Sequence, residues 1–362
     1  MPNPVEKARS GLQLMFVADA LSMPVHWYYD PRDISRQFPG GIQGFEAAPA
    51  KHPSSIMNLH STSGGGRGGQ NGSIVGEVIL KGRKSLWGQQ GVHYHHGMPA
   101  GENTLNAHCA RLMLRHLQAG DYSGPGFLEA YARFMTADPP LHPDTYAESF
   151  HRGFFANWRA GKDLTRCAAV THDTPSIGGL VMIGALALTL LARGMPADSV
   201  KQAARTQLGH THPDEGLTRV CDAYVQLLSK LLLSTAIDEA QEQIAVTAAS
   251  SAGSGIVSLL HKPPRDDSFV VGGKYSLACY IDSSWPVVLY LAHKYLEDPL
   301  QGLLQNTNLG GENCHRGAVL GTILGAASGC RLELFEQLLH ADQIQAEIEG
   351  ALQNLPANLD GA

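Results

Sequence analysis

The stretch from Asn308 to Gly329 constrains the fold more than any other part of the chain. Its second half, from Gly317 onward, repeats Gly and Ala at three- and four-residue spacing, which predicts a buried helix that a neighbouring backbone approaches closely. Its first half, residues 310–315, is polar and predicts the N-terminus of that helix. A helix start offers free N–H groups and the positive end of the helix dipole, and preceding glycines let a ligand approach the backbone.

The tripeptide Gly-Glu-Asn occurs twice, at residues 101–103 and 311–313, each time just before an apolar helix. Asn103 or Thr104 is expected to cap the first of these helices, because short polar side chains accept bonds from free N–H groups. Two such helix starts that face each other would gather carboxylate, amide and dipole around one place. We therefore expect Glu102 and Glu312 to share one pocket.

The periodicity elsewhere predicts an all-α protein. Further helices are expected at residues 7–21, 105–117, 127–134, 145–158, 177–191, 199–208, 215–233, 236–249 and 287–295. Strand-like alternation is nearly absent, with residues 73–80 the one ambiguous candidate. No linker divides the chain, so we expect a single domain over residues 1–362 with its core at about 8–330. The Gly-rich stretch 61–72 lacks the lysine of a phosphate-binding loop, and we expect a mobile surface loop that could act as a lid.

Charge and cysteine content limit the partners and the compartment. The net charge is -6 and no Lys/Arg-rich run occurs, so neither nucleic acid nor an anionic membrane is expected as a partner. The six cysteines are scattered without a CxxC pair, which indicates free thiols in a reducing compartment, the cytoplasm. The polar start MPNPVEKARS lacks the apolar region of a signal peptide, and the apolar segment 181–191 is too short to cross a bilayer.

Four polar loops at helix ends carry the reactive side chains. They centre on His26, on residues 93–103, on residues 172–176 with the nearby histidines at 210 and 212, and on residues 312–315. Helical bundles build cofactor and metal sites from side chains of facing helices. Two Glu, several His and one Cys suit Zn, Mn or Fe better than an all-oxygen set would. Cys314 is alternatively a nucleophile, although His315 beside it would not face it on a regular helix.

In order and spacing, these elements resemble the ADP-ribosylglycohydrolase family, of the dinitrogenase-reductase-activating-glycohydrolase type. That family opens with G-D-[AS]-[LM]-G-x-P-x-E, where this chain has ADALSMPVH at residues 18–26. Its T-D-D-T element corresponds to GENT at 101–104, its N-G-x-x-M-R element to 177–182, and its closing N-x-G-G-D-x-D-T element to 308–315. The resemblance covers roughly residues 8–330 and implies a compact multi-helix orthogonal bundle with long active-site loops.

The resemblance also implies a site, which this chain alters. The family holds two Mg²⁺ or Mn²⁺ ions with oxygen ligands, and the matching positions here are His26, Gly101, Glu102, Asn103, Glu312, Cys314 and His315. Because Mg²⁺ demands octahedral oxygen coordination, we expect Zn, Mn or Fe at this set, or no metal. The expected metal ligands are Glu102, Asn103, Glu312, Cys314 and His315. The expected catalytic residues are Glu102, Glu312 and Cys314. The expected substrate-binding residues are Asp19, His26, His95, His96, Gly310 and Gly311.

Three functions follow from this reasoning. The first is hydrolysis of a ribosyl N- or O-glycosidic bond in an ADP-ribosylated protein or a related small molecule, with Glu102 or Glu312 as general base. The second is a different small-molecule reaction that uses Cys314 or the histidines with a metal other than Mg²⁺. The third is a non-catalytic protein that binds a nucleotide or serves a structural role. The oligomeric state is not predicted.

Overall fold

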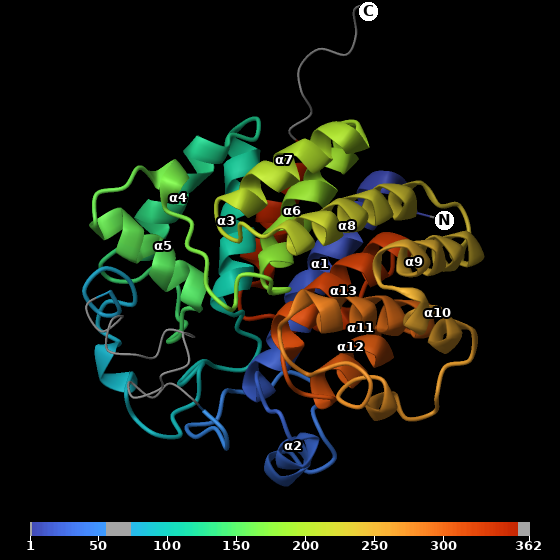
Figure 1. Cartoon of the computed structure of the whole chain (residues 1–362), viewed down its shortest axis with the longest axis horizontal. Helices are drawn as coiled ribbons and strands as arrows, with labels where there is room; N and C mark the ends of the chain where they lie inside the picture. The colour runs from blue at the N-terminus through green and yellow to red at the C-terminus, as the bar shows by residue number, and fades with distance from the viewer. Residues whose placement is uncertain (1, 56–73, 354–362) are drawn as a thin grey trace, which may run out of the picture.

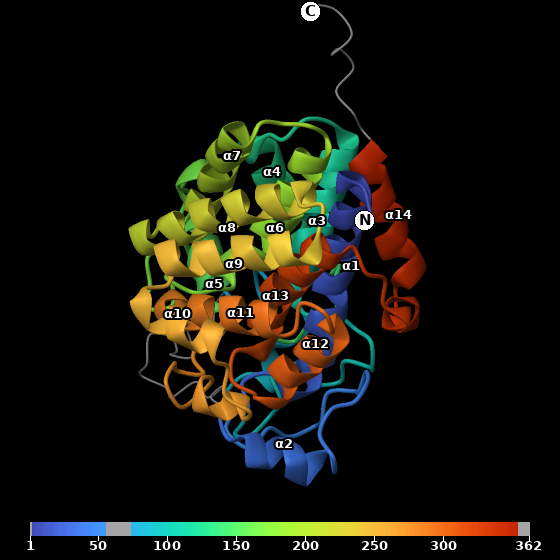
Figure 2. The ribbon, with the colours of Figure 1, turned by 90° about the vertical axis from the view of Figure 1, so that its right-hand side faces the viewer.

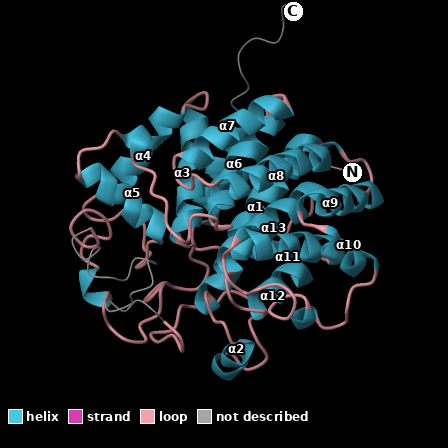
Figure 3. Ribbon diagram, viewed as in Figure 1, coloured by secondary structure: helices cyan, strands magenta, loops and turns pink. Residues whose placement is uncertain are grey.

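The computed structural model describes residues 2–55 and 74–353, and these residues are helical as predicted. Their only β pairing consists of isolated bridges, and Figure 3 shows helices joined by long loops. The predicted all-α fold class is confirmed. The described helices are α1 (Pro4–Ser22), α2 (Pro31–Gln37), α3 (Leu105–Ala119), α4 (Gly124–Thr136), α5 (Ser149–Arg159), α6 (Gly179–Ala192), α7 (Ala197–Gly209), α8 (Glu215–Leu233), α9 (Ile237–Ser251), α10 (Ser254–His261), α11 (Ile281–Lys294), α12 (Pro299–Asn308), α13 (Asn313–Ser328) and α14 (Ala341–Gln353).

Helices α1 and α13 form the centre of the molecule and contact each other more than any other pair (Figure 1). The glycines of α13 allow this approach, as the small-residue spacing predicts. A Cβ on Gly321 would overlap the carbonyl oxygen of Leu14, and one on Gly325 would lie 2.5 Å from the backbone nitrogen of Gly11. Backbone against backbone leaves no room for a methyl group, so each glycine is required at its place.

The other helices surround this central pair. Helix α6 is almost completely buried, and α3 and α8 pack against it. Helices α4 and α5 lie on one side of the centre, and α9 and α10 lie on the other (Figure 1). Helix α14 runs along the outer edge beside α1 and α3 (Figure 2). The long loops gather at the end of the body where α2 lies (Figure 3).

Four helices were not expected from the sequence: α2, α10, α12 and α14. Each has 13 residues or fewer, a length at which an isolated helix is marginal in water. Tertiary packing supports three of them: α10 packs on α9, α12 on α13 and α14 on α3. Local periodicity therefore gave a weak signal for elements that tertiary contacts stabilise.

Two helix starts differ from the prediction by four residues or more. Helix α5 begins at Ser149 rather than at residue 145, because the side chains of Asp144 and Thr145 bind other segments. Asp144 accepts a bond from the backbone N–H of Leu105, and Thr145 donates to the carbonyl of Tyr94. Helix α11 begins at residue 281, ahead of Pro286, where the missing N–H removes a single bond near the helix start.

No helix in the described ranges is both long and apolar enough to cross a membrane. The ambiguous segment at residues 74–80 is a series of turns with one isolated bridge. The Gly-rich stretch 61–72, expected to be a lid, lies outside the described residues.

Candidate active site

Four helix N-termini converge on one place: those of α3, α5, α6 and α13. Their N-cap residues are Thr104, Glu148, Gly178 and Glu312. A Cβ on Gly178 would lie 3.2 Å from Asn106 Nδ2, 3.2 Å from a Glu148 oxygen and 3.3 Å from His315 Nδ1, so α6 closes tightly over the other three starts. Helix N-termini carry partial positive charge, which favours carboxylates at this place. The two helix starts that bear the repeated tripeptide do meet, through Asn106 and His315.

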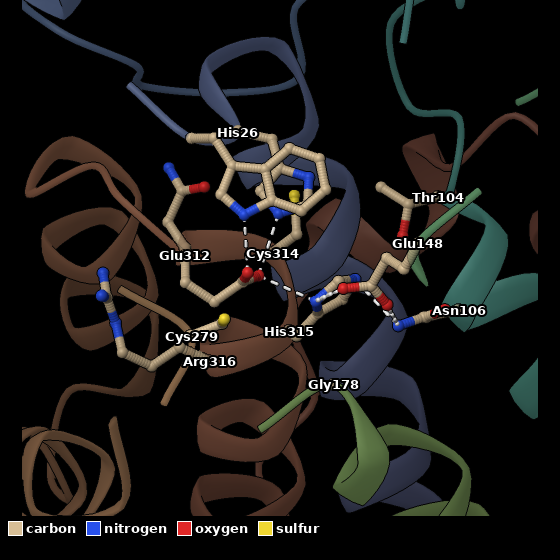
Figure 4. Close-up of polar contacts among 12 residues, drawn as sticks. His26, Thr104, Asn106, Glu148, Gly178, Cys279, Glu312, Cys314, His315 and Arg316 are labelled. Carbon is tan, nitrogen blue, oxygen red and sulfur yellow. Dashed lines mark hydrogen bonds and ion pairs between the residues drawn. The ribbon is translucent and has the colours of Figure 1, made fainter. Parts of the chain in front are cut away.

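Glu312 is the most enclosed carboxylate of the site, with no exposed side-chain surface. One oxygen accepts from Trp27 Nε1 at 2.6 Å, and the other lies 2.9 Å from His26 Nε2 and 2.8 Å from His315 Nδ1 (Figure 4). Burial alone would raise its pKa, but the charge of His315 and the bonds from the two histidines lower the pKa well below its usual value. Glu312 is therefore a carboxylate throughout the neutral range.

His315 joins Glu312 to a second glutamate, Glu148. Its Nδ1 lies 3.6 Å from Glu148 Oε1, and Figure 4 shows His315 between the two glutamates. Burial would lower the pKa of His315, but the two carboxylates raise it to about 10, so the ring carries a positive charge. Burial raises the pKa of Glu148 and its neighbour Glu312 adds to the effect. The two glutamates on either side of one imidazole thus have pKa values displaced in opposite directions.

The side-chain amide of Asn106 contacts both Glu148 and His315. As oriented, its nitrogen faces Glu148 Oε2 at 2.7 Å and His315 Nε2 at 3.0 Å, and its oxygen faces His151 Nε2 at 3.0 Å. Exchanging the amide oxygen and nitrogen lets the oxygen accept from a protonated Glu148 and from the N–H of a charged His315. The raised pKa values of both groups favour this second orientation.

A chain of buried rings leads away from Glu312. His26 Nδ1 lies 2.7 Å from His95 Nε2, and His95 Nδ1 lies 2.9 Å from Asp144. Burial lowers the pKa of His26 to about 3, so this ring is neutral, and it must donate its Nε2 proton to the Glu312 carboxylate. His26 Nδ1 is then an acceptor, so His95 Nε2–H donates to it. Glu312 and Asp144 are joined by an unbroken hydrogen-bonded path when both nitrogens of His95 carry a proton, because the Asp144 carboxylate only accepts.

Trp27 is held in an unusual backbone conformation. Its φ of 62° lies in the left-handed region, which a bulky residue rarely adopts. Its N–H donates to the carbonyl of Gly311 at 2.8 Å, and Gly311 N–H donates to Tyr28 at 2.7 Å. Its ring stacks on His26 at 3.7 Å between centroids. These contacts fix the indole N–H on Glu312.

A small cavity of ≈ 70 Å³ opens beside the two glutamates. The described residues that line it are Trp27, Tyr29, Tyr94, Tyr146, Glu148, Ser149, Asp173, Cys279 and Glu312. Tyr29 is 46% exposed, so the cavity meets solvent on that side. Glu148 and Glu312 are the two lining groups that share His315.

Of the residues predicted to be catalytic, the cavity lining includes Glu312 but neither Glu102 nor Cys314. The carboxylate of Glu102 faces His108 at 3.0 Å and His340 at 3.3 Å, and shares no partner with Glu312. The Cys314 thiol is buried against Met23 and Met98 and points at the carbonyl of Asp19. Burial and the nearby carboxylates raise the pKa of Cys314 well above that of a free thiol, so it is not a thiolate.

Asp19 and Asn103 bind each other within the protein. Asp19 is fully buried and accepts bonds from Asn103 Nδ2 and from the Thr104 side chain and N–H. The expected cap of α3 is therefore replaced by carboxylates from other segments, Asp19 and Asp144.

The remaining predicted binding residues divide into two groups. His26 and His95 belong to the buried ring chain, whereas His96 is partly exposed and its Nδ1 lies 3.3 Å from the carbonyl of Ala50. Gly310 and Gly311 have φ of 71° and 66°, and a Cβ on either would overlap a carbonyl oxygen of the protein itself. These glycines let their loop pack closely against the backbone of the protein itself. The sequence predicts this close approach for a ligand instead.

Several residues of the site were not predicted from the sequence: Trp27 as a donor, Asn106, Asp144, Glu148 and the tyrosines at 94 and 146. Asn106 lies two residues after the GENT element, a position that could have indicated it. Glu148 gave no local signal, because residues 145–158 were expected to form one helix and Glu148 would have been in its interior.

Two groups of described residues bring three possible metal ligands within 4.8 Å of one another: His26 with His95 and Cys314, and His26 with Glu312 and His315. Neither suits Mg²⁺, which requires oxygen ligands. A charged His315 and a protonated Cys314 are not ligands, and both nitrogens of His26 already face hydrogen-bond partners. The residues present therefore do not fit the family's dinuclear centre.

Known proteins provide a separate line of evidence. A family model described as ADP-ribosylglycohydrolase matches residues 1–357. No curated protein matches the sequence. Among solved structures, a chain of an "ADP-ribosylglycohydrolase-related protein complex" aligns with a TM-score of 0.57 at 14% identity, covering 97% of this chain and 99% of that chain. At this identity the likeness shows a shared fold alone.

Proposed function

The chain belongs to the ADP-ribosylglycohydrolase family, and we propose that it hydrolyses a ribosyl N- or O-glycosidic bond with Glu148 and Glu312 as its working carboxyl groups. The substrate is an ADP-ribosylated protein or a related small molecule. One observation carries the proposal: two glutamates from different helix starts line the same cavity and flank the same nitrogen of His315. Glycoside hydrolysis uses such a pair, one protonated and one ionised.

Each glutamate has a distinct role. Glu148, whose pKa is raised, donates its proton to the leaving atom as the bond to the anomeric carbon breaks. Glu312, whose pKa is lowered, stays ionised and stabilises the positive charge that develops on the ribosyl ring. Water then adds to the anomeric carbon and gives a proton to Glu148, which restores the starting state. The general base in this scheme is Glu148, in place of Glu102 or Glu312 as predicted from the sequence, and Glu312 acts through its charge.

The proposed reaction uses no metal, because the donor atoms of the site hold protons and bind one another. Metal analysis of the purified protein tests this point. We expect far less than one Zn, Mn, Fe or Mg ion per chain after dialysis without chelator. Stoichiometric Zn or Fe would favour the second function predicted from the sequence, in which Cys314 or the histidines act with a metal other than Mg²⁺.

The decisive experiment compares hydrolysis rates of Glu148→Gln, Glu312→Gln and Glu102→Gln on ADP-ribosylated protein and on ADP-ribosyl small molecules. Loss of a general acid or of the stabilising carboxylate costs about 10²–10⁴-fold in rate. We expect that loss for Glu148 and Glu312 and a much smaller one for Glu102. Glu129→Gln, on the exposed face of α4, is the matched control. Equal rates in wild type and Glu148→Gln would contradict the proposal.

A further inference from the structure

A second cavity lies far from the two glutamates, at the other ends of helices α3 and α6. Both helices begin at the active site, where Thr104 and Gly178 are their N-cap residues, and both end at this cavity. A helix of 15 residues such as α3 spans about 22 Å, so the two places are well separated. The volume is ≈ 660 Å³, within the range of about 300–1,000 Å³ that is usual for small-molecule sites. We call it the Arg193 cavity, after the residue that follows α6 and lines it.

Arg193 brings a fixed positive charge to this cavity. It is only 7% exposed, and two backbone carbonyls hold its guanidinium: Nε lies 2.8 Å from the oxygen of Ala351, and Nη2 lies 2.7 Å from the oxygen of Leu117. Among the described residues, Nη1 has no hydrogen-bond partner and no carboxylate forms an ion pair with the guanidinium. Arginine stays charged in proteins, and its planar fork matches a carboxylate. The group is therefore oriented for an anion before any ligand arrives.

Asp121, just after the end of α3, brings the opposite charge to the same cavity. It is exposed, and it makes no hydrogen bond or ion pair within the ranges that the structure describes. Burial lowers the pKa of Arg193 and the charge of Asp121 raises it, so the two groups interact although they are not in contact. A cation alone or an anion alone would attract one of them and be repelled by the other. A zwitterion matches both.

Much of the remaining surface of the Arg193 cavity is apolar. Residues with apolar or aromatic side chains line it: Leu190, Met195, Pro196, Ala203 and Tyr122. The Tyr122 hydroxyl donates to Gln207 Oε1 at 3.1 Å, which holds the ring in place, and Met195 is 38% exposed. Covering this surface with an apolar group is favourable because both are removed from water. The matching ligand therefore combines two opposite charges with an apolar part.

We propose that the Arg193 cavity is a second ligand site, separate from the active site, and that it binds a free amino acid with a large apolar side chain. The carboxylate of the amino acid binds Arg193, its ammonium group binds Asp121, and its side chain lies on the apolar lining. Binding here does not depend on the reaction at Glu148 and Glu312. A nucleotide matches the cavity poorly, since its phosphates would bring several negative charges to one arginine and one aspartate.

Calorimetric titration with four probes tests the charge pattern. L-phenylalanine carries both charges, N-acetyl-L-phenylalanine keeps only the carboxylate, L-phenylalanine amide keeps only the ammonium group, and L-serine is a zwitterion without the apolar part. We expect L-phenylalanine to bind about tenfold more tightly than its amide or L-serine, and about 3–5-fold more tightly than the N-acetyl form, because Asp121 is exposed. Equal binding of L-phenylalanine and any other probe would overturn the proposal. So would the absence of L-phenylalanine binding at about 10 mM.

Spectra of protein with ¹³C-labelled methionine methyl groups locate the ligand. The signal of Met195, identified by its loss in Met195→Leu, should shift when L-phenylalanine is added. The signals of Met23 and Met98, which are buried beside Cys314 near the active site, should stay in place. Binding that leaves the Met195 signal unmoved would place the ligand elsewhere and overturn the proposal.

Asp121→Asn removes one of the two charges at an exposed position and keeps the shape of the side chain. It should weaken L-phenylalanine binding about 3–5-fold and strengthen binding of the N-acetyl form, whose carboxylate no longer faces an acid. Asp198→Asn is the matched control, because Asp198 is an exposed carboxylate in the first turn of α7 that does not line the cavity. Arg193 is left intact because it holds the last turns of α3 and α14. Unchanged L-phenylalanine affinity in Asp121→Asn would contradict the assignment.

Discussion

The tripeptide Gly-Glu-Asn begins two helices of this protein, and its two glutamates end in different surroundings. Gly101 and Gly311 both have a positive φ, and both glutamates are buried in front of a buried helix. Glu102 turns toward His108 of its own helix and His340 before α14. Glu312 turns toward Trp27, His26 and His315 at the edge of the cavity.

The difference shows that a buried glutamate at a helix start is not by itself a site. The helix that packs opposite decides its role. Facing α13, the starts of α5 and α6 bring Glu148 and Gly178 against His315. The loop before α14 faces the start of α3 beside Glu102. This loop contributes backbone atoms and the side chain of His340, which is 36% exposed. Substitutions on the two sides of the molecule test this contrast.

Gly311→Ala should destabilise the protein far more than Gly101→Ala. A Cβ at Gly311 would overlap the carbonyl oxygen of Leu277 at φ of 66°, and neither backbone can move without losing the Glu312 N–H bond to Leu277. We expect a loss of more than about 4 kcal/mol, or failure to fold. At Gly101 the nearest atom is 3.0 Å away, and the strain of the left-handed region costs about 1–2 kcal/mol. Urea unfolding measures both, and equal losses would contradict the contrast.

Stability should fall in acid because His26 is buried and neutral. Its pKa in the folded protein is about 3, below the ordinary 6.5, so between these values the unfolded chain takes up a proton that the folded one does not. The contribution of neutral His26 to the free energy of unfolding is complete above pH 6.5 and is lost as the pH falls toward 3. We expect about 3 kcal/mol of loss between about pH 7 and pH 4 from this residue. Urea unfolding at a series of pH values measures this loss. In His26→Asn, the free energy of unfolding should fall less steeply with decreasing pH than in wild type. An unchanged pH dependence would show that other groups cause the loss.

His315→Gln should cost more stability than His108→Gln. The first change leaves Glu312 without its charged partner in a fully buried place, which costs about 3 kcal/mol or more. The second leaves Glu102 with His340 and the N–H of Asn103, so we expect about 1 kcal/mol. Denaturant titration of both variants at neutral pH gives the comparison. A larger loss for His108→Gln would reverse our assignment of the two glutamates.

The smallest effect is expected for His340→Ala. The side chain of His340 is 36% exposed and lies 3.3 Å from Glu102, so solvent screens the contact. We expect a change of less than about 1 kcal/mol in unfolding free energy and unaltered hydrolysis. A large loss of hydrolysis in this variant would make the Glu102 side part of the active site after all.

The central helix, and the close approach of a neighbouring backbone to it, followed from the sequence alone. Gly and Ala spacing in residues 317–329, and a polar segment ahead of it, are local signals that follow from how side chains space on a helix. The all-α class and the place of Glu312 at a helix start followed from the same rules. Short helices such as α12 and α14 did not, since packing stabilises them.

Which side chains meet depends on how the helices pack against one another. From the sequence, Glu148 is predicted to lie inside a helix. In the structure, Asp144 and Thr145 bind other segments, so α5 begins at Ser149 and Glu148 is its N-cap residue. Glu102 and Glu312 share the tripeptide Gly-Glu-Asn, and their other partners, His340 for one and Trp27 and His26 for the other, lie in segments distant along the chain. Side-chain pairing across such separations depends on how helices pack, and helical periodicity carries no information about it.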